Sequence, residues 1–138
     1  MSDVTVKASS DQKYTQTIEA GPYNLVADID QSMGGDEKGP NPHQLMLSSL
    51  GACTSITVQM YAKRKGWNLE KVTIDLTEDK VTDPENPSRT MPKIVREITL
   101  TGDLTEEQIA DLTRIADKCP IHKLITGPKE IATNVQKS

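Results

Sequence analysis

The stretch that most constrains the fold is NPHQLMLSSLGACTSITVQM at residues 41–60. Asn41 suits the N-cap of a helix, Pro42 suits its first position, and the basic KRKG at residues 63–66 suits its end. Apolar side chains cover most of the circumference of this helix, which is typical of a buried helix. We therefore expect one long helix, starting near Asn41, in the interior of the fold.

Strands are predicted before this helix. Alternating or β-forming residues favour three strands at residues 4–8, 14–19 and 23–30. The GP turn that separates the second strand from the third is compatible with a meander of antiparallel strands. Three Gly and two Pro in residues 31–42 then predict a loop that leads into the helix.

Two further strands follow the helix. Residues 71–81 and 93–104 alternate between apolar and polar side chains, as half-buried strands do. On the second of these strands, Arg96 shares a face with the apolar Ile94. Three prolines in residues 82–92 predict an exposed loop between the strands.

The sequence of the last quarter of the chain predicts two helices and a strand. Thr105 and Gln108 have the spacing of a capping box, and the helix they begin runs to about residue 118. A short helix is expected at residues 120–125 and a last strand at residues 129–136. The segregated strands and helices predict an α+β fold, and we expect residues 1–138 to form a single domain.

Composition narrows the class of protein. The net charge is −4, and no run of Lys or Arg with interleaved aromatic residues indicates a nucleic-acid surface. We find neither the apolar core of a signal peptide nor a stretch of 18 apolar residues, so we expect no membrane span and a cytoplasmic location. Thiols stay reduced in that compartment. Cys53 and Cys119 are therefore expected to be free core thiols, metal ligands or redox-active residues.

The surroundings of Cys119 leave several interpretations open. Pro120 can start a helix, which would place Cys119 where backbone N–H groups lower a thiol pKa. His122 lies three residues further on and could activate the thiol as a base. The same spacing is half of a zinc site, which would need further ligands such as Cys53 or His43. A buried thiol with no chemistry is the remaining alternative.

His43 precedes Cys53 by ten residues on the predicted helix. A straight helix separates them by about 15 Å of rise and about 80° of rotation. His43 could therefore act on Cys53 only through a bend, a bridging group or a second chain. An exposed or capping role is the alternative for both histidines.

Two segments carry a resemblance to a known family. KGPNPHQLMLSSLGACTSITVQMYAKRKGW at residues 38–67, followed by IADKCPIH at residues 115–122, resembles the OsmC/Ohr family of thiol-dependent hydroperoxide reductases. The likeness covers about residues 34–135. It implies an α+β OsmC-like fold in which two long central helices lie back to back. Antiparallel sheets from both chains of an intertwined homodimer would surround these helices.

The resemblance also implies an activity. The peroxidatic cysteine of the family falls on Cys53, and its resolving cysteine falls on Cys119. The Cys53 thiolate would attack an organic hydroperoxide, and the resulting sulfenic acid would condense with Cys119 to a disulfide. A dithiol such as a lipoylated protein would reduce the disulfide, with no other cofactor. The alternative is a catalytically weak dimer that binds a small ligand or senses redox state.

One feature of the family is missing from its usual place. Its best-studied members hold the thiolate with an Arg and hold that Arg with a Glu near the start of the helix. Residues 1–63 contain no Arg, and His43 occupies the position of the Glu. We expect His43, His122, Arg64 or Arg96 to take over this role.

Overall fold

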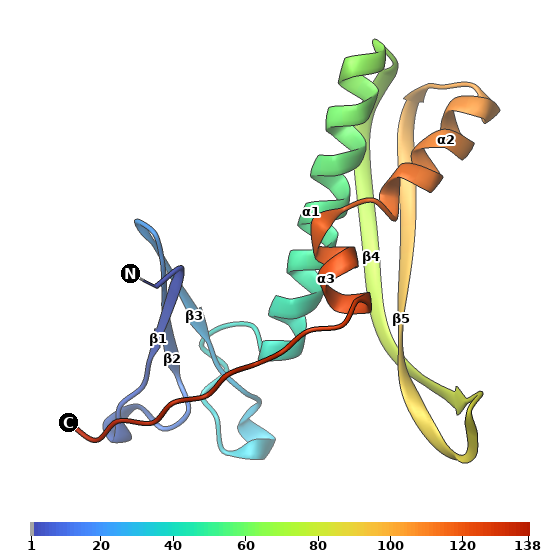
Figure 1. The fold of residues 1–138 in the computed structure, drawn as a ribbon. Helices are drawn as coiled ribbons and strands as arrows, with labels where there is room; N and C mark the ends of the chain where they lie inside the picture. The colour runs from blue at the N-terminus through green and yellow to red at the C-terminus, as the bar shows by residue number, and fades with distance from the viewer. Residues whose placement is uncertain (1) are drawn as a thin grey trace. The chain divides into compact units, whose positions relative to one another are not determined.

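The computed structural model describes residues 2–138. Its internal contacts form two compact units, the first ending at Ser48 and the second beginning at Ser49. Figure 1 labels the helices and strands of both units. No helix in this described range is long and apolar enough to cross a membrane.

The first unit contains the predicted meander. β1 (Val4–Lys7), β2 (Gln16–Ala20) and β3 (Tyr23–Ala27) form one antiparallel sheet in the order β1-β2-β3. Ile18 in the middle strand is paired with a residue of each neighbour, Val6 on β1 and Leu25 on β3. The prediction of three consecutive antiparallel strands is confirmed.

The buried Asp28 organises the loop that follows β3. Its carboxylate accepts hydrogen bonds from the Thr15 hydroxyl at 2.7 Å and from the backbone N–H groups of Ile29, Lys38 and Asp36 at 2.8, 3.2 and 3.5 Å. Burial alone would raise the pKa of Asp28, but these four donors lower it. The loop thus winds around one ionised carboxylate.

α1 (Pro42–Lys65) begins where the sequence predicts. The Asn41 side chain accepts the N–H of Gln44 at 2.9 Å, and the Gln44 side chain accepts the N–H of Asn41 at 2.9 Å. This reciprocal pair satisfies two backbone N–H groups that a helix start would otherwise leave open.

The expected burial of α1 on all sides is wrong for the single chain. One stripe of α1 is buried, and its residues are Leu50, Gly51, Thr54, Val58 and Ala62. Ile56 and Met60, on another face, are 54% and 62% exposed. Within residues 2–138, the elements that pack on α1 therefore bury one stripe of it.

β4 (Asn68–Asp83) and β5 (Asn86–Asp103) form one long antiparallel hairpin. The predicted loop at residues 82–92 is therefore mostly wrong, because most of it is strand. Pro92 lies within β5, opposite Lys80. In a two-stranded ribbon every strand is an edge strand, and an edge tolerates a residue without an N–H donor.

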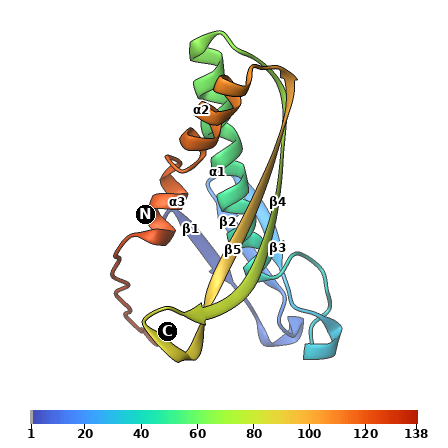
Figure 2. The ribbon, with the colours of Figure 1, turned by 90° about the vertical axis from the view of Figure 1, so that its right-hand side faces the viewer.

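The core of the second unit lies between α1, the hairpin and α2 (Glu106–Ala116). Val58 and Ala62 of α1 pack with Leu112 and Ala116 of α2, and half-buried hairpin side chains complete the cluster. Figures 1 and 2 show this part of α1 running alongside the hairpin. A Cβ on Gly51 would lie 2.8 Å from a methyl group of Leu76. Gly51 therefore lets Leu76 of β4 approach α1 closely.

The end of the chain contains one confirmed helix and no strand. α3 (Pro120–Thr126) follows Cys119, as predicted. The strand predicted at residues 129–136 is wrong, because this segment has no regular structure. Its alternating Ile131 and Val135 are 84% and 91% exposed, and none of the strands described in residues 2–138 pairs with this segment. The class is nevertheless the predicted α+β, with antiparallel sheets.

Candidate functional site

The two cysteines come together in the second unit. Cys53 lies on α1 and is half-buried, whereas Cys119 is the N-cap of α3 and is fully buried. The Cys119 sulfur accepts the backbone N–H of His122 at 3.2 Å, and the nearby Cys53 thiol helps to lower the pKa of Cys119. Both thiols are free. Residues 66 positions apart in the sequence therefore share one site.

Thr54 links this pair of sulfurs to a positive charge. It is fully buried, and its hydroxyl oxygen lies 2.7 Å from the carbonyl oxygen of Leu50 and 3.7 Å from the sulfur of Cys119. The same oxygen accepts a hydrogen bond from Nη1 of Arg96 at 3.0 Å. Thr54 thus stands between a guanidinium group and a thiol.

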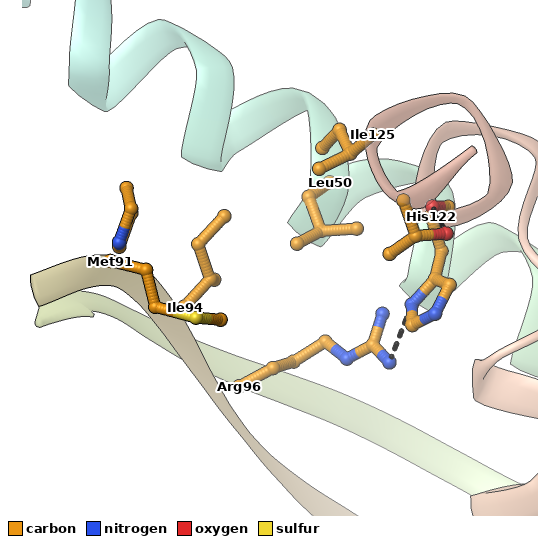
Figure 3. A pocket seen from close by; sticks show the side chains of 8 residues that line it. Leu50, Met91, Ile94, Arg96, His122 and Ile125 are labelled. Atoms are coloured by element: carbon orange, nitrogen blue, oxygen red, sulfur yellow. Dashed lines mark hydrogen bonds between the residues drawn. The ribbon is translucent and has the colours of Figure 1, made fainter. Parts of the chain in front are cut away.

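Arg96 is held on three sides. Besides Thr54, its Nη2 contacts Oδ1 of Asp117 at 2.7 Å and Nδ1 of His122 at 3.2 Å. Only 12% of its side chain is exposed. A guanidinium only donates hydrogen bonds, so Nδ1 of His122 is the acceptor, and the neutral ring carries its proton on Nε2. Figure 3 shows the guanidinium pointing toward the His122 ring.

These neighbours change the acidity of Cys119. Burial alone would raise the pKa of the Cys119 thiol. Hydrogen bonds from the His122 N–H, the Thr54 hydroxyl and the Cys53 thiol, together with the charge of Arg96, outweigh burial and lower this pKa. The site therefore favours a negative charge on sulfur.

A cavity of about 380 Å³ adjoins the Arg96 cluster (Figure 3). Its lining residues come from α1, β5 and α3: Leu50, Met91, Pro92, Ile94, Arg96, His122, Ile125 and Thr126. Most of these side chains are apolar, and the charged or titratable ones are Arg96 and His122. Neither cysteine lines the cavity, but Arg96 and His122 contact both the cavity and the Thr54–Cys119 pair. The cavity is suited to an apolar molecule with a polar group turned toward Arg96 and His122.

Three of the four predicted site residues lie in this cluster: Cys53, Cys119 and His122. His43 is an exposed residue in the first turn of α1, within the unit that ends at Ser48. Its predicted role stays a prediction. Arg64 lies ten residues beyond Thr54 on the same helix, with its guanidinium 5.7 Å from the centre of the Tyr61 ring. Of the two Arg residues considered, Arg96 is therefore the one beside the thiols.

Thr54 and Asp117 were not recognised from the sequence. Thr54 had a usable signal, because it lies four residues after Leu50 and four before Val58, on the buried stripe of α1. Asp117 had no such signal, because it is 64% exposed and joins the site through Arg96 at 2.7 Å and Nδ1 of His122 at 3.9 Å. Within residues 2–138, no three His, Cys, Asp or Glu side chains are arranged to hold a metal ion.

Comparison with known proteins agrees with this architecture. The sequence model of the OsmC family, described as "OsmC-like protein", matches residues 35–134. Over 134 residues, the chain is 24% identical to the "Hydroperoxide reductase" of Mycoplasma pneumoniae, covering 96% of this chain and 86% of that protein. It is 26% identical over 121 residues to the "Uncharacterized protein YmaD" of Bacillus subtilis, covering 83% and 79% of the two chains.

Solved structures show the same fold. The crystal structure of an OsmC-like protein from Mycoplasma pneumoniae superposes with a TM-score of 0.72 at 21% identity, covering 91% of this chain and 86% of that one. The family match spans well over half of the chain and includes both cysteines. This protein belongs to the OsmC/Ohr family of OsmC-like proteins.

Proposed function

We propose that the protein reduces organic hydroperoxides, with Cys53 as the peroxidatic and Cys119 as the resolving cysteine. The observation that carries this proposal is the chain of contacts from Arg96 through Thr54 to Cys119. It supplies a partly buried positive charge beside two free thiols, from a position other than the usual one in the family. The name of the Mycoplasma pneumoniae relative supports the same chemistry.

The reaction takes three steps. The Cys53 thiolate attacks the hydroperoxide, an S–O bond forms, the O–O bond breaks, and the alkoxide takes up a proton to leave as an alcohol. The Cys119 thiolate then attacks the Cys53 sulfenic acid, and a disulfide forms as hydroxide leaves and becomes water. A dithiol supplies two electrons and two protons, which restore both thiols. We propose a lipoylated protein as the source of this dithiol.

The adjoining cavity gives the proposal its substrate class. Its apolar wall, which includes Leu50, Ile94 and Ile125, accommodates the organic group of a hydroperoxide. The polar oxygens would then lie near Arg96 and the cysteines. Hydrogen peroxide has no group to fill this cavity, so we expect an organic hydroperoxide to be the better substrate.

Three further predictions belong to this proposal. We propose that residues 1–138 act as a single OsmC-like domain and that two chains form an intertwined homodimer. We also propose a cytoplasmic location, where a dithiol reductant is present. Light scattering of the purified protein tests the dimer, since a mass of one chain at micromolar concentration would contradict it.

Peroxide consumption by purified variants tests the activity. With cumene hydroperoxide and a dithiol such as dihydrolipoamide, we expect turnover by the parent protein and none by Cys53→Ser. Cys119→Ser keeps the attacking thiol, so with no reductant present it should consume about one equivalent of peroxide. Turnover by Cys53→Ser at the parent rate would refute the proposal.

A second function is favoured by one observation. Arg96 already donates to Thr54, Asp117 and His122, so its charge is shared among several groups and not directed to Cys53 alone. This arrangement also suits a catalytically weak dimer that binds a small ligand or senses redox state. Oxidation to the disulfide without sustained turnover in the same assay would establish this alternative.

A further inference from the structure

We propose that the oxidised cysteine pair is reopened at Cys53, with Cys119 as the leaving thiolate, and that Thr54 is the positioning residue whose hydroxyl stabilises that thiolate. This inference rests on the disulfide of the proposed function and concerns its reduction. It assigns different roles to the two sulfurs and a role to a side chain that touches no substrate.

The first argument is access. A thiol reductant must reach the sulfur that it attacks, because the new bond forms at that atom. Cys119 is 0% exposed, whereas Cys53 is half-buried on α1. Attack at Cys53 therefore requires the smaller opening of the site. The bond that breaks then releases its electron pair onto Cys119.

The second argument is that the groups around Cys119 can stabilise the negative charge that its sulfur carries when the disulfide opens. The sulfur of Cys119 already accepts the N–H of His122 at 3.2 Å, and the hydroxyl of Thr54 lies 3.7 Å away. Arg96 contributes a positive charge behind this hydroxyl. A thiol whose pKa is lowered is also the better leaving group in disulfide exchange. These groups all favour the departure of Cys119.

The third argument concerns the single proton of the Thr54 hydroxyl. This group has two acceptors within reach, the carbonyl oxygen of Leu50 at 2.7 Å and the sulfur of Cys119 at 3.7 Å, but it can donate to only one at a time. A disulfide sulfur is a weak acceptor, so the proton points to Leu50 in the oxidised state. A thiolate is a strong acceptor, and rotation of the hydroxyl brings the proton to Cys119. Arg96, which donates to the same oxygen, favours this polarisation.

The step balances as a thiol–disulfide exchange. A thiolate of the reductant forms a bond to the Cys53 sulfur, the bond between Cys53 and Cys119 breaks, and Cys119 keeps the electron pair. The second thiol of a dithiol then attacks the sulfur of its own first thiol, releasing Cys53 as a thiolate. Overall the reductant becomes a cyclic disulfide, and two protons from its thiols return to the cysteines.

The position of attack can be read directly. The protein is oxidised to the disulfide with diamide, treated briefly with glutathione and quenched with acid, and the adduct is then mapped by mass spectrometry. We expect glutathione on Cys53 and a free thiol at Cys119. An adduct on Cys119 would overturn the proposal.

Thr54 is tested by the rate of reopening. We expect Thr54→Val to slow reduction of the disulfide by about tenfold, because one hydrogen bond to a charged group is lost. Thr54→Ser retains the hydroxyl and should stay close to the parent rate. Thr113→Val is the matched control, since the Thr113 hydroxyl likewise donates to a carbonyl four residues earlier on a helix, Ile109 at 2.8 Å. Equal slowing in all three variants would rule out the role of Thr54.

A purely structural role for Thr54 predicts a different pattern. In the Cys53→Ser background, the ultraviolet absorbance of the Cys119 thiolate can be followed against pH. We expect Thr54→Val to move its midpoint upward and Thr54→Ser to leave it near that of Cys53→Ser alone. An unchanged midpoint in Thr54→Val would contradict stabilisation of the thiolate.

Diamide separates this inference from the proposed function. A disulfide that forms with diamide but not with hydroperoxide would refute the peroxidase proposal, while the position of glutathione attack would still decide the inference. A chain that forms no disulfide with either oxidant would refute both.

Discussion

Two buried acidic groups, Asp28 and Cys119, are surrounded by donors in different ways. Asp28 accepts hydrogen bonds from one hydroxyl and three backbone N–H groups, which hold the following loop around it. Cys119 accepts one backbone N–H and lies beside Thr54, behind which stands Arg96. The pKa of each group is lowered against the effect of burial.

The difference separates a structural site from a chemical one. The donors of Asp28 are mostly backbone groups of the loop it organises, so its charge serves the local fold. Cys119 has the Thr54 hydroxyl, the positive charge of Arg96 and a second thiol nearby, and the cavity beside Arg96 is lined mostly by apolar side chains. A lowered pKa is therefore common to both, while the cavity and the second reactive group are particular to the cysteine site.

The largest effect on turnover, apart from loss of Cys53 itself, is expected from Arg96. Arg96→Gln removes the positive charge near the developing thiolates and should lower kcat/KM for cumene hydroperoxide by about a hundredfold, the scale for losing one electrostatic stabiliser. Steady-state peroxide consumption measures it. Arg89→Gln is the matched control on the same strand, because Arg89 also pairs with a carboxylate, Asp83 at 3.0 Å.

Arg96→Lys sharpens this prediction. A lysine retains the charge but lacks the planar fork that reaches Thr54 and Asp117 together, so we expect partial activity. Equal activity of Arg96→Gln and Arg89→Gln would mean that Arg96 has no role in the reaction. The positive charge of Arg96 would then no longer distinguish the surroundings of Cys119 from those of Asp28.

The sequence predicts the local parts of this fold well. The meander, the start of α1 and the two short-range caps follow from patterns within a few residues, such as Asn41 with Gln44 and Thr105 with Gln108. The predicted strand at residues 129–136 failed because a strand also needs a neighbour, which local alternation does not supply. The loop predicted at residues 82–92 was mostly wrong because an edge strand of a two-stranded ribbon tolerates proline, so the prolines did not end the hairpin strands.

The site was only partly predictable for the same reason. Alternation placed Arg96 on the apolar face of its strand, and the resemblance pointed to both cysteines. Thr54 lies 42 residues before Arg96 in the sequence, and Asp117 lies 21 residues after it. Such pairs depend on how the helices and the hairpin pack, and no short-range pattern encodes that packing. The contacts of Arg96 with Thr54 and Asp117 therefore became visible only in three dimensions.

A smaller effect, on selectivity, is expected from the cavity. Ile125→Trp places a larger side chain in the cavity beside Leu50 and His122. We expect KM for cumene hydroperoxide to rise about tenfold, as when an apolar pocket no longer fits its substrate. Hydrogen peroxide should be affected little, because it needs no apolar space. The ratio of the two kcat/KM values is the measurement.

Leu124→Trp is the matched control for this substitution. Leu124 precedes Ile125 on α3 but is 58% exposed and does not line the cavity. A similar loss with both peroxides in Ile125→Trp would indicate damage to the cysteine site and contradict the assignment of the cavity to the organic group.

The smallest effect on turnover is expected from a substitution of Asp28. This substitution tests whether the Asp28 carboxylate stabilises the local fold and takes no part in the reaction. Asp28→Asn should leave kcat/KM per folded molecule unchanged but lower the free energy of unfolding near neutral pH. One carboxylate oxygen accepts the Thr15 hydroxyl and the Lys38 N–H, and the other accepts the N–H groups of Ile29 and Asp36. An Asn amide can replace only one of these oxygens, because its NH₂ group is a donor.

The pH dependence gives this prediction its sign. The pKa of Asp28 is lowered in the folded state, so its stabilisation is complete above the unfolded pKa of about 3.9 and is lost as pH falls through the lower folded value. Urea unfolding should therefore show a difference in the free energy of unfolding between parent and Asp28→Asn that is constant near neutrality and shrinks only in strong acid.

Asp36→Asn, on the same loop and paired with Lys13 at 3.2 Å, is the control and should show a much smaller difference. A difference for Asp28→Asn that persisted unchanged in acid would show that Asp28 acts by its shape and not by its charge, and Cys119 would then be the only one of the two groups that needs a negative charge.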